Sequence, residues 1–98
     1  MATDVSLIHD MARAVRTKSE SGKEEVADLI EACKKDMEIK GVYVTDETEP
    51  LCKQAIKLYC KANYGYDKDS EKFAKAYSDL RDSMALSGNY KKVGDNDV

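Results

Sequence analysis

The sequence predicts an all-α domain, a small bundle of about four helices around a central third helix, followed by a C-terminal tail. Apolar residues recur with the helical period in successive stretches of the chain. The glycines stand singly near the ends of these stretches, and the chain has only one proline. A hydrophobic fraction of 42% with 36% charged residues fits a helix-rich globular domain. At 98 residues, a single domain with one modest core is expected.

The first helix is expected to begin at Thr3 or Asp4, because either side chain can accept a hydrogen bond from a free amide of the first turn. It is expected to run to about Thr17. The spacing places a set of apolar residues on one face, as in an ordinary amphipathic helix. This face consists of Leu7, Ile8, Met11, Ala12 and Val15.

The second helix is expected over residues 23–40, started by a capping box of Ser21 and Glu24. Its apolar residues form a narrow stripe, which predicts a helix packed on one side only. Lys40 and Gly41 suit its end, since a cation favours the last turn and glycine readily takes the left-handed conformation. Residues 42–44 are expected to form a loop whose valines tuck under the bundle.

The third helix is the element around which the chain is organised. An acidic run at residues 45–49, TDETE, followed by Pro50 is typical of a helix start, and Gly65 is expected to end the helix after about Tyr64. Its apolar residues cover more than half of its circumference, so other helices should cover it from several directions. These residues are Leu51, Cys52, Ala55, Ile56, Leu58, Tyr59, Cys60 and Ala62. The remaining wet strip holds Lys53, Gln54, Lys57, Lys61 and Tyr64.

The last helix is expected over about residues 70–86, with Asp67 or Asp69 as its cap and Gly88 at its end. The polar residues that follow are too poor in apolar surface to order themselves alone. The sequence therefore predicts a helical domain over residues 1–88 and a disordered tail over residues 89–98.

No residues with the spacing of an active site, a metal site or a cofactor site stand out. Cys33, Cys52 and Cys60 are odd in number, lie at apolar helical positions and show no CxxC spacing, so we interpret them as core residues. His9 is the only histidine and lacks the partners of a nucleophilic site. Asp46, Glu47 and Glu49 are expected to lie in a solvated loop, where nothing in the sequence indicates the burial needed for acid-base catalysis. We predict that the protein is not an enzyme and has no cofactor.

Basic residues form two groups, although the net charge of -3 gives no strong drive toward nucleic acid. Lys53, Lys57 and Lys61 repeat every four residues on one helix face. Another group lies around the first interhelical turn and consists of Arg13, Arg16, Lys18 and Lys23. Each group is a candidate to face DNA or an acidic neighbouring subunit, and a simple solvated face is the alternative. The N-terminus lacks the pattern of a signal peptide and no stretch is long enough for a membrane span, so a cytosolic protein is expected.

Three stretches in this order carry a family resemblance: EEVADLIEACKKDMEIKGV, TDETEPLCKQAIKLYCKANYGYD and SEKFAKAYSDLRDSMALSG. Together they resemble the tailed-phage head-tail connector proteins of the HK97 gp6-like family, often labelled phage DNA-packaging proteins. The resemblance covers about residues 7–90. Its most specific features are the acidic residues before Pro50, the segment 64–67 and the ending at residues 86–88. The chain departs from the family pattern at residues 16–19, where similar proteins often have an Arg-Ile/Val-Asp-like turn.

The resemblance implies a structural protein of a phage or prophage rather than an enzyme. Such subunits form a homo-oligomeric ring below the portal protein, extend the DNA channel and receive the stopper or tail-completion protein. Packaged DNA would pass through the ring without sequence-specific recognition. The implied location is the host cytoplasm during assembly and then the head-tail interface of the virion. We expect the second and fourth helices to present the ring surfaces. The alternative is a small helical DNA-binding or regulatory module.

Overall fold

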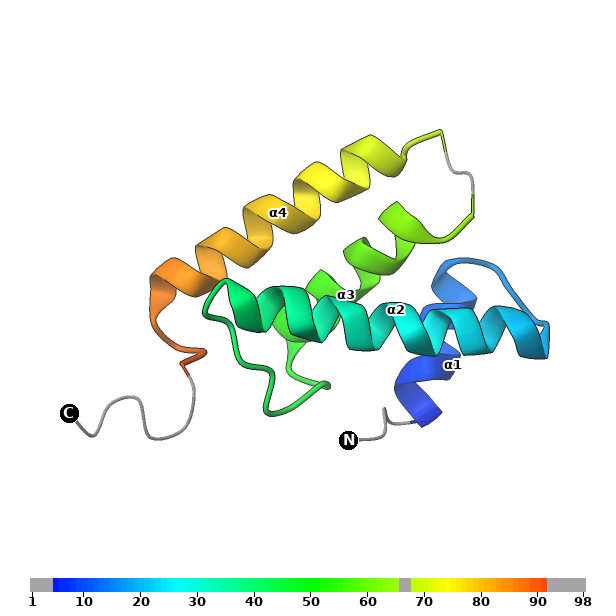
Figure 1. Ribbon diagram of the computed structural model, residues 1–98, viewed down its shortest axis with the longest axis horizontal. Coiled ribbons are helices and arrows are strands. Elements are labelled where there is room, and N and C mark those ends of the chain that lie inside the picture. Colours follow the sequence, from blue (N-terminus) through cyan, green and yellow to red (C-terminus); the bar gives the residue numbers. More distant parts are fainter. Residues whose placement is uncertain (1–4, 66–67, 92–98) are drawn as a thin grey trace.

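The computed structural model describes residues 5–65 and 68–91. Its helices are α1 (Val5–Ala14), α2 (Glu20–Ile39), α3 (Pro50–Asn63) and α4 (Ser70–Ser87), and the described residues contain no strand. Helix α4 lies along one side of α3, while α1 and α2 lie on the other (Figure 1). Because α3 contacts all the other helices, the predicted all-α bundle around a central third helix is confirmed.

The core draws side chains from every helix and from the loop after α2. Its buried members are Leu7, Met11, Val26, Ile30, Cys33, Met37, Val42, Cys52, Ala55, Ile56, Cys60, Tyr77 and Met84. On α3, Leu58 and Tyr59 are only half-buried and pack at the margin of this core. Leu51, in the first turn of α3, remains 45% exposed. The covered face of α3 is therefore narrower than its apolar pattern predicts.

Helix α1 ends at Ala14, which is earlier than the predicted end near Thr17. Its last turn closes with two backbone hydrogen bonds: the Thr17 amide donates to the Ala12 carbonyl at 2.9 Å, and the Arg16 amide donates to the Arg13 carbonyl at 3.1 Å. This pattern is the Schellman motif, which reverses the chain direction after a helix. The caps predicted for this helix, Thr3 and Asp4, lie outside the described residues.

Helix α2 begins at Glu20 and is capped by Ser19, so the predicted start with Ser21 as the cap is wrong. The Ser19 hydroxyl oxygen accepts a hydrogen bond from the Gly22 amide at 3.0 Å. Gly22 is buried inside the first turn, where a Cβ atom would lie 2.1 Å from Thr17 Oγ1 and 2.8 Å from the Tyr64 hydroxyl. Gly22 therefore permits close packing within a helix and does not mark a loop.

The end of α2 agrees with the prediction. Gly41 takes a left-handed conformation with φ of 89°, directly after the C-cap residue Lys40. The Val42 amide donates to the Met37 carbonyl at 2.8 Å, and both side chains are buried. The following loop is thus anchored under the bundle through Val42, as expected for these valines.

The start of α3 is held by Glu49 and Pro50. The Glu49 carboxylate accepts hydrogen bonds from the amides of Leu51 at 3.2 Å and Cys52 at 3.1 Å, while Pro50 occupies the first turn. Desolvation alone would raise the pKa of Glu49, but hydrogen bonds from Cys52 and Leu51 outweigh it and lower the pKa. The negative charge at the positive end of the helix adds to this stabilisation.

Replacing Glu49 by alanine is expected to lower the free energy of unfolding by about 1 kcal/mol, the usual effect of losing an N-cap acceptor. Urea denaturation followed by circular dichroism measures the change. Glu49→Gln keeps an acceptor oxygen without the charge, so it should retain part of the stability. Equal stability of Glu49→Ala and the wild type would show that the carboxylate does not act as the cap.

The C-terminal segment extends the described fold beyond the predicted boundary at Gly88. Gly88 ends α4 with φ of 74°, as predicted, but the chain then returns to the loop after α2. The Tyr43 amide donates to the Tyr90 carbonyl at 2.7 Å, and the Tyr90 side chain packs against the core. Residues 89–91, which the sequence assigns to the tail, are thus held near the fold by the carbonyl and the side chain of Tyr90. Residues 92–98 of the predicted tail lie outside the described residues.

Candidate functional site

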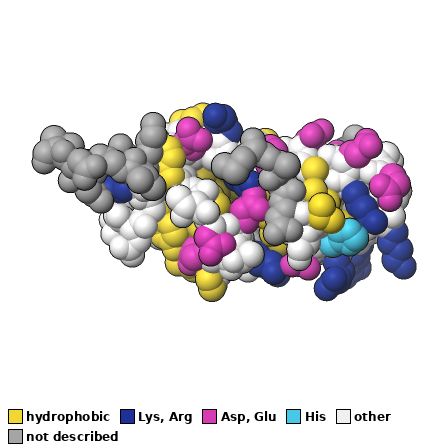
Figure 2. All heavy atoms as spheres, turned by 90° about the horizontal axis from the view of Figure 1, so that it is seen from below, with side chains coloured by type: hydrophobic (Ala, Val, Ile, Leu, Met, Phe, Trp, Pro, Cys, Tyr) yellow, Lys and Arg dark blue, Asp and Glu magenta, His cyan; other side chains and the backbone are white. Residues whose placement is uncertain are grey.

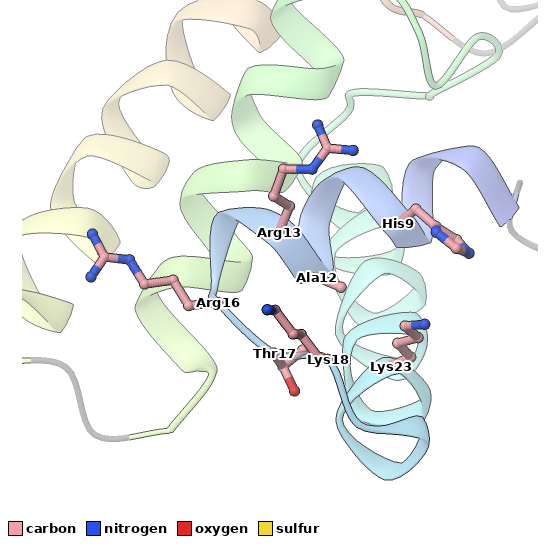
Figure 3. A pocket seen from close by; sticks show the side chains of 7 residues that line it. All are labelled: His9, Ala12, Arg13, Arg16, Thr17, Lys18 and Lys23. Carbon is pink, nitrogen blue, oxygen red and sulfur yellow. The ribbon is translucent and has the colours of Figure 1, made fainter.

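Basic side chains surround a hollow of about 440 Å³ between the end of α1 and the start of α2. We call it the basic hollow. Its lining residues are His9, Ala12, Arg13, Arg16, Thr17, Lys18 and Lys23, and they include no carboxylate (Figure 3). Lys and Arg side chains gather near His9, at one end of the molecule (Figure 2). The structure thus brings together the predicted candidates Arg13, Arg16 and Lys18.

The local sequence explains this clustering. His9 and Arg13 are four residues apart on α1 and therefore share one of its faces, and Arg16 follows in the closing turn. The turn then leads directly into α2, which brings Lys18 and Lys23 to the same place. Arg13 lies 3.9 Å from Asp10 and Lys23 lies 3.9 Å from Glu20, and both are loose ion pairs within one helical turn. Neither Arg16 nor Lys18 forms an ion pair with a carboxylate among the described residues.

Arg16 is the one non-glycine residue of the described chain with a positive φ, 62°. It occupies the position after the helix cap where glycine is preferred, because a Cβ atom disfavours the left-handed conformation by about 1–2 kcal/mol. The rest of the closing turn is fully formed around it. The chain therefore keeps a cation at this place at a cost in backbone energy.

A second hollow, of about 480 Å³, adjoins Arg16 on its other side and lies next to α3 and α4. It is lined by Ala14, Val15, Arg16, Lys61, Tyr64, Lys68, Asp69 and Phe73. Since Arg16 lines both hollows, it connects the basic hollow with Lys61, another predicted candidate. Asp69 is the one acidic residue in this lining.

The lysines of α3 do not form the open wet strip that their spacing predicts. Lys53, Lys57 and Lys61 are all half-buried. Lys53 Nζ lies 2.8 Å from Asp10 Oδ2 of α1, and this hydrogen bond lowers the pKa of the Asp10 carboxyl. Lys61 Nζ lies 5.2 Å from the centre of the Phe73 ring of α4. Lys53 and Lys61 thus bridge α3 to its neighbours, and Lys61 also lines the second hollow together with Arg16.

Arg16→Gly is expected to raise the free energy of unfolding by about 0.5–1 kcal/mol, because relief of the left-handed strain exceeds the added freedom of the unfolded chain. Chemical denaturation of the two proteins measures the difference. Arg13→Gly is the matched control, since glycine inside α1 should destabilise by about 1 kcal/mol. A loss of stability in Arg16→Gly would show that the arginine side chain supports the fold.

The cysteines are core residues, as predicted. Cys33, Cys52 and Cys60 are buried and free, and desolvation raises the pKa of each thiol to about 12. They are therefore protonated at neutral pH and poor nucleophiles. Within residues 5–65 and 68–91, no three His, Cys, Asp or Glu side chains come together as a metal site.

An interaction between α2 and α4 has no counterpart in the sequence analysis. Asp36 Oδ2 accepts hydrogen bonds from the Tyr77 hydroxyl at 2.6 Å and from Arg81 Nη1 at 2.9 Å. Arg81 also lies 5.4 Å from the centre of the Tyr77 ring. Among the described residues, all buried side-chain nitrogen and oxygen atoms have a hydrogen-bond partner. This cluster is thus a structural link and leaves no polar group pointing at a ligand.

None of the helices in the described part of the chain has the length and apolar character needed to cross a membrane. Comparisons with protein-family models, with curated proteins and with solved structures find no match to this chain.

Proposed function

We propose that the protein is a structural, non-enzymatic head-tail connector subunit of a tailed phage or prophage. The observation that carries this proposal is the order of the acidic-proline start of α3, the segment at residues 64–67 and the Leu86-Ser87-Gly88 ending, which resembles the connector family. In this role the subunit forms a homo-oligomeric ring below the portal, extends the DNA channel and receives the stopper or tail-completion protein. It works in the host cytoplasm during assembly and then at the head-tail interface of the virion.

The arrangement of the helices is compatible with a ring. A closed ring with one kind of interface joins two different surfaces of each subunit. Helices α2 and α4 flank α3, and each has an exposed charged side, for example at Glu25 of α2 and Lys72 of α4. These are the surfaces that we propose to meet between neighbouring subunits.

Native mass spectrometry over a concentration series, with and without a portal ring, tests the proposal. We expect a ring, either alone or on the portal. Glu25→Lys and Lys72→Glu reverse exposed charges on the proposed surfaces and should weaken assembly without changing the helical content. A protein that stays monomeric at all concentrations and never binds the portal would contradict the connector function.

The second candidate function is a small helical DNA-binding or regulatory module. The concentration of basic side chains around Arg16 favours it. Such a module would bind DNA as a monomer or small oligomer and would not bind a portal ring. The mass spectrometry experiment therefore separates the two functions.

A further inference from the structure

We infer that the basic hollow and the second hollow form one continuous surface, centred on Arg16, that binds the phosphodiester backbone of duplex DNA without reading its sequence. The inference names the residues with which the proposed connector would contact DNA, and in that respect it rests on the proposed function. The surface itself is present in the isolated subunit, so its binding can be measured without a ring.

The accumulation of charge is the first argument. The chain as a whole has a net charge of -3, yet the basic hollow is lined by Arg13, Arg16, Lys18 and Lys23 and by no carboxylate. The second hollow adds Lys61 and Lys68 next to a single carboxylate. Local positive charge of this kind attracts polyanions even when the whole protein is acidic.

The shape of the cationic surface favours an extended polyanion over a single ion. The side chains of Arg13 and Arg16 point in different directions instead of converging on one point (Figure 3). Arg16 also joins two adjacent hollows, so the cations follow a track from α1 and α2 toward α3 and α4. A phosphodiester backbone presents its charges at regular intervals along such a track.

The composition of the surface favours nucleic acid over an acidic protein segment. Protein interfaces usually contain an apolar centre, whereas protein-DNA interfaces are more polar and more positive. The exposed large hydrophobic residues Val5, Ile39, Leu51 and Leu86 all lie outside both linings. The apolar and aromatic residues within the linings are buried or half-buried; they are Ala12, Ala14, Val15, Tyr64 and Phe73. The two linings are hollows rather than a helix or strand that projects into a DNA groove to contact base edges. We therefore infer contacts to phosphates alone.

The left-handed backbone conformation of Arg16 is an argument that does not depend on the charge or shape of the surface. Glycine at this position would relieve the left-handed strain, yet an arginine stands there without an ion-pair partner among the described residues. Strained backbone at a surface cation indicates a role other than stability. Contact with phosphate is a role that explains both the charge and its position between the hollows.

Fluorescence anisotropy with two 20-base-pair duplexes of unrelated sequence, over a series of salt concentrations, tests the inference. We expect equal affinity for both duplexes, falling steeply as salt rises. Arg16→Gly and Lys18→Gln should each weaken binding and reduce the slope of log affinity against log salt by about one. Arg16→Gly should do so while making the protein more stable, which a merely structural role of the arginine would not produce.

Lys35→Gln is the matched control, because Lys35 is an exposed lysine of α2 outside both hollows. It should bind both duplexes like the wild type. The inference is overturned by absence of binding at low salt, or by an equal loss in Lys35→Gln and Arg16→Gly. It is also overturned if Arg16→Gly leaves DNA binding intact and instead reduces self-association in sedimentation experiments.

The outcomes for the two proposals are separable. Ring or portal assembly without DNA binding would reject this inference and leave the connector function in place. DNA binding that depends on Arg16 and Lys18, in a protein that never assembles, would support the inference and contradict the connector.

Discussion

Ile56→Ala is expected to lower the free energy of unfolding by about 2–5 kcal/mol, the range for emptying a buried aliphatic site. Ile56 is fully buried in α3, the helix that contacts all the others. Removing its side chain leaves a cavity where the helices meet, and neighbouring side chains can fill it only in part. Small domains have about 5–15 kcal/mol of total stability, so this change should be the most damaging single truncation in α3.

Thermal and urea denaturation measure the effect, and each kcal/mol should lower the melting temperature by about 4–8 °C in a domain of this size. Leu51→Ala is the matched control, because Leu51 lies on the same helix and is 45% exposed. Its truncation should have a clearly smaller effect. Equal losses in the two variants would mean that the first turn of α3 is covered and that its buried face is assigned wrongly.

The sequence predicts helix ends well where the signal is local. Gly41 after α2, Pro50 at α3 and Gly88 after α4 act through their own backbone preferences, and the helices end or begin beside them as expected. The start of α2 is different. Gly22 lies inside the helix, where Thr17 and Tyr64 approach so closely that they leave no room for a side chain. Tyr64 is distant in the sequence, so this contact is not visible in the local sequence.

The candidate site, too, can be predicted from the sequence only in part. The clustering of Arg13, Arg16 and Lys18 follows from their closeness in the chain, and the sequence predicts it. The approach of Lys61 to Arg16 depends on how α1 packs near α3, which helical periodicity does not determine. The left-handed backbone of Arg16 could not be predicted either, since glycine normally marks this position.

Asp36 shows why polar links between helices escape sequence analysis. By its position on the charged side of α2, it resembles an ordinary solvent-exposed residue. Its partners Tyr77 and Arg81 lie on α4, and only the packing of the helices brings them together. The Tyr77 ring also meets the Tyr59 ring edge-on, with centroids 5.1 Å apart, so the link is continuous with the core.

Asp36→Ala is expected to lower the free energy of unfolding by about 2–3 kcal/mol, because it leaves the buried Tyr77 hydroxyl and the Arg81 guanidinium without this acceptor. Tyr77→Phe removes one of the two hydrogen bonds and should have a smaller effect. A double-mutant cycle of these variants measures the coupling between Asp36 and Tyr77. Additive losses would contradict a direct interaction.

The same link predicts how stability depends on pH. Desolvation alone would raise the pKa of Asp36, but hydrogen bonds from Tyr77 and Arg81 outweigh it and hold the pKa below the ordinary value of 3.8. A carboxyl with a lowered pKa in the folded state stabilises the fold above its unfolded pKa, and this contribution is lost as the pH falls through the folded pKa. Asp36→Asn should therefore be less stable than the wild type at neutral pH and should lose less stability on acidification below about pH 4. Parallel pH profiles of the two proteins would contradict the role of the charged Asp36, because the neutral asparagine cannot contribute a titration of its own.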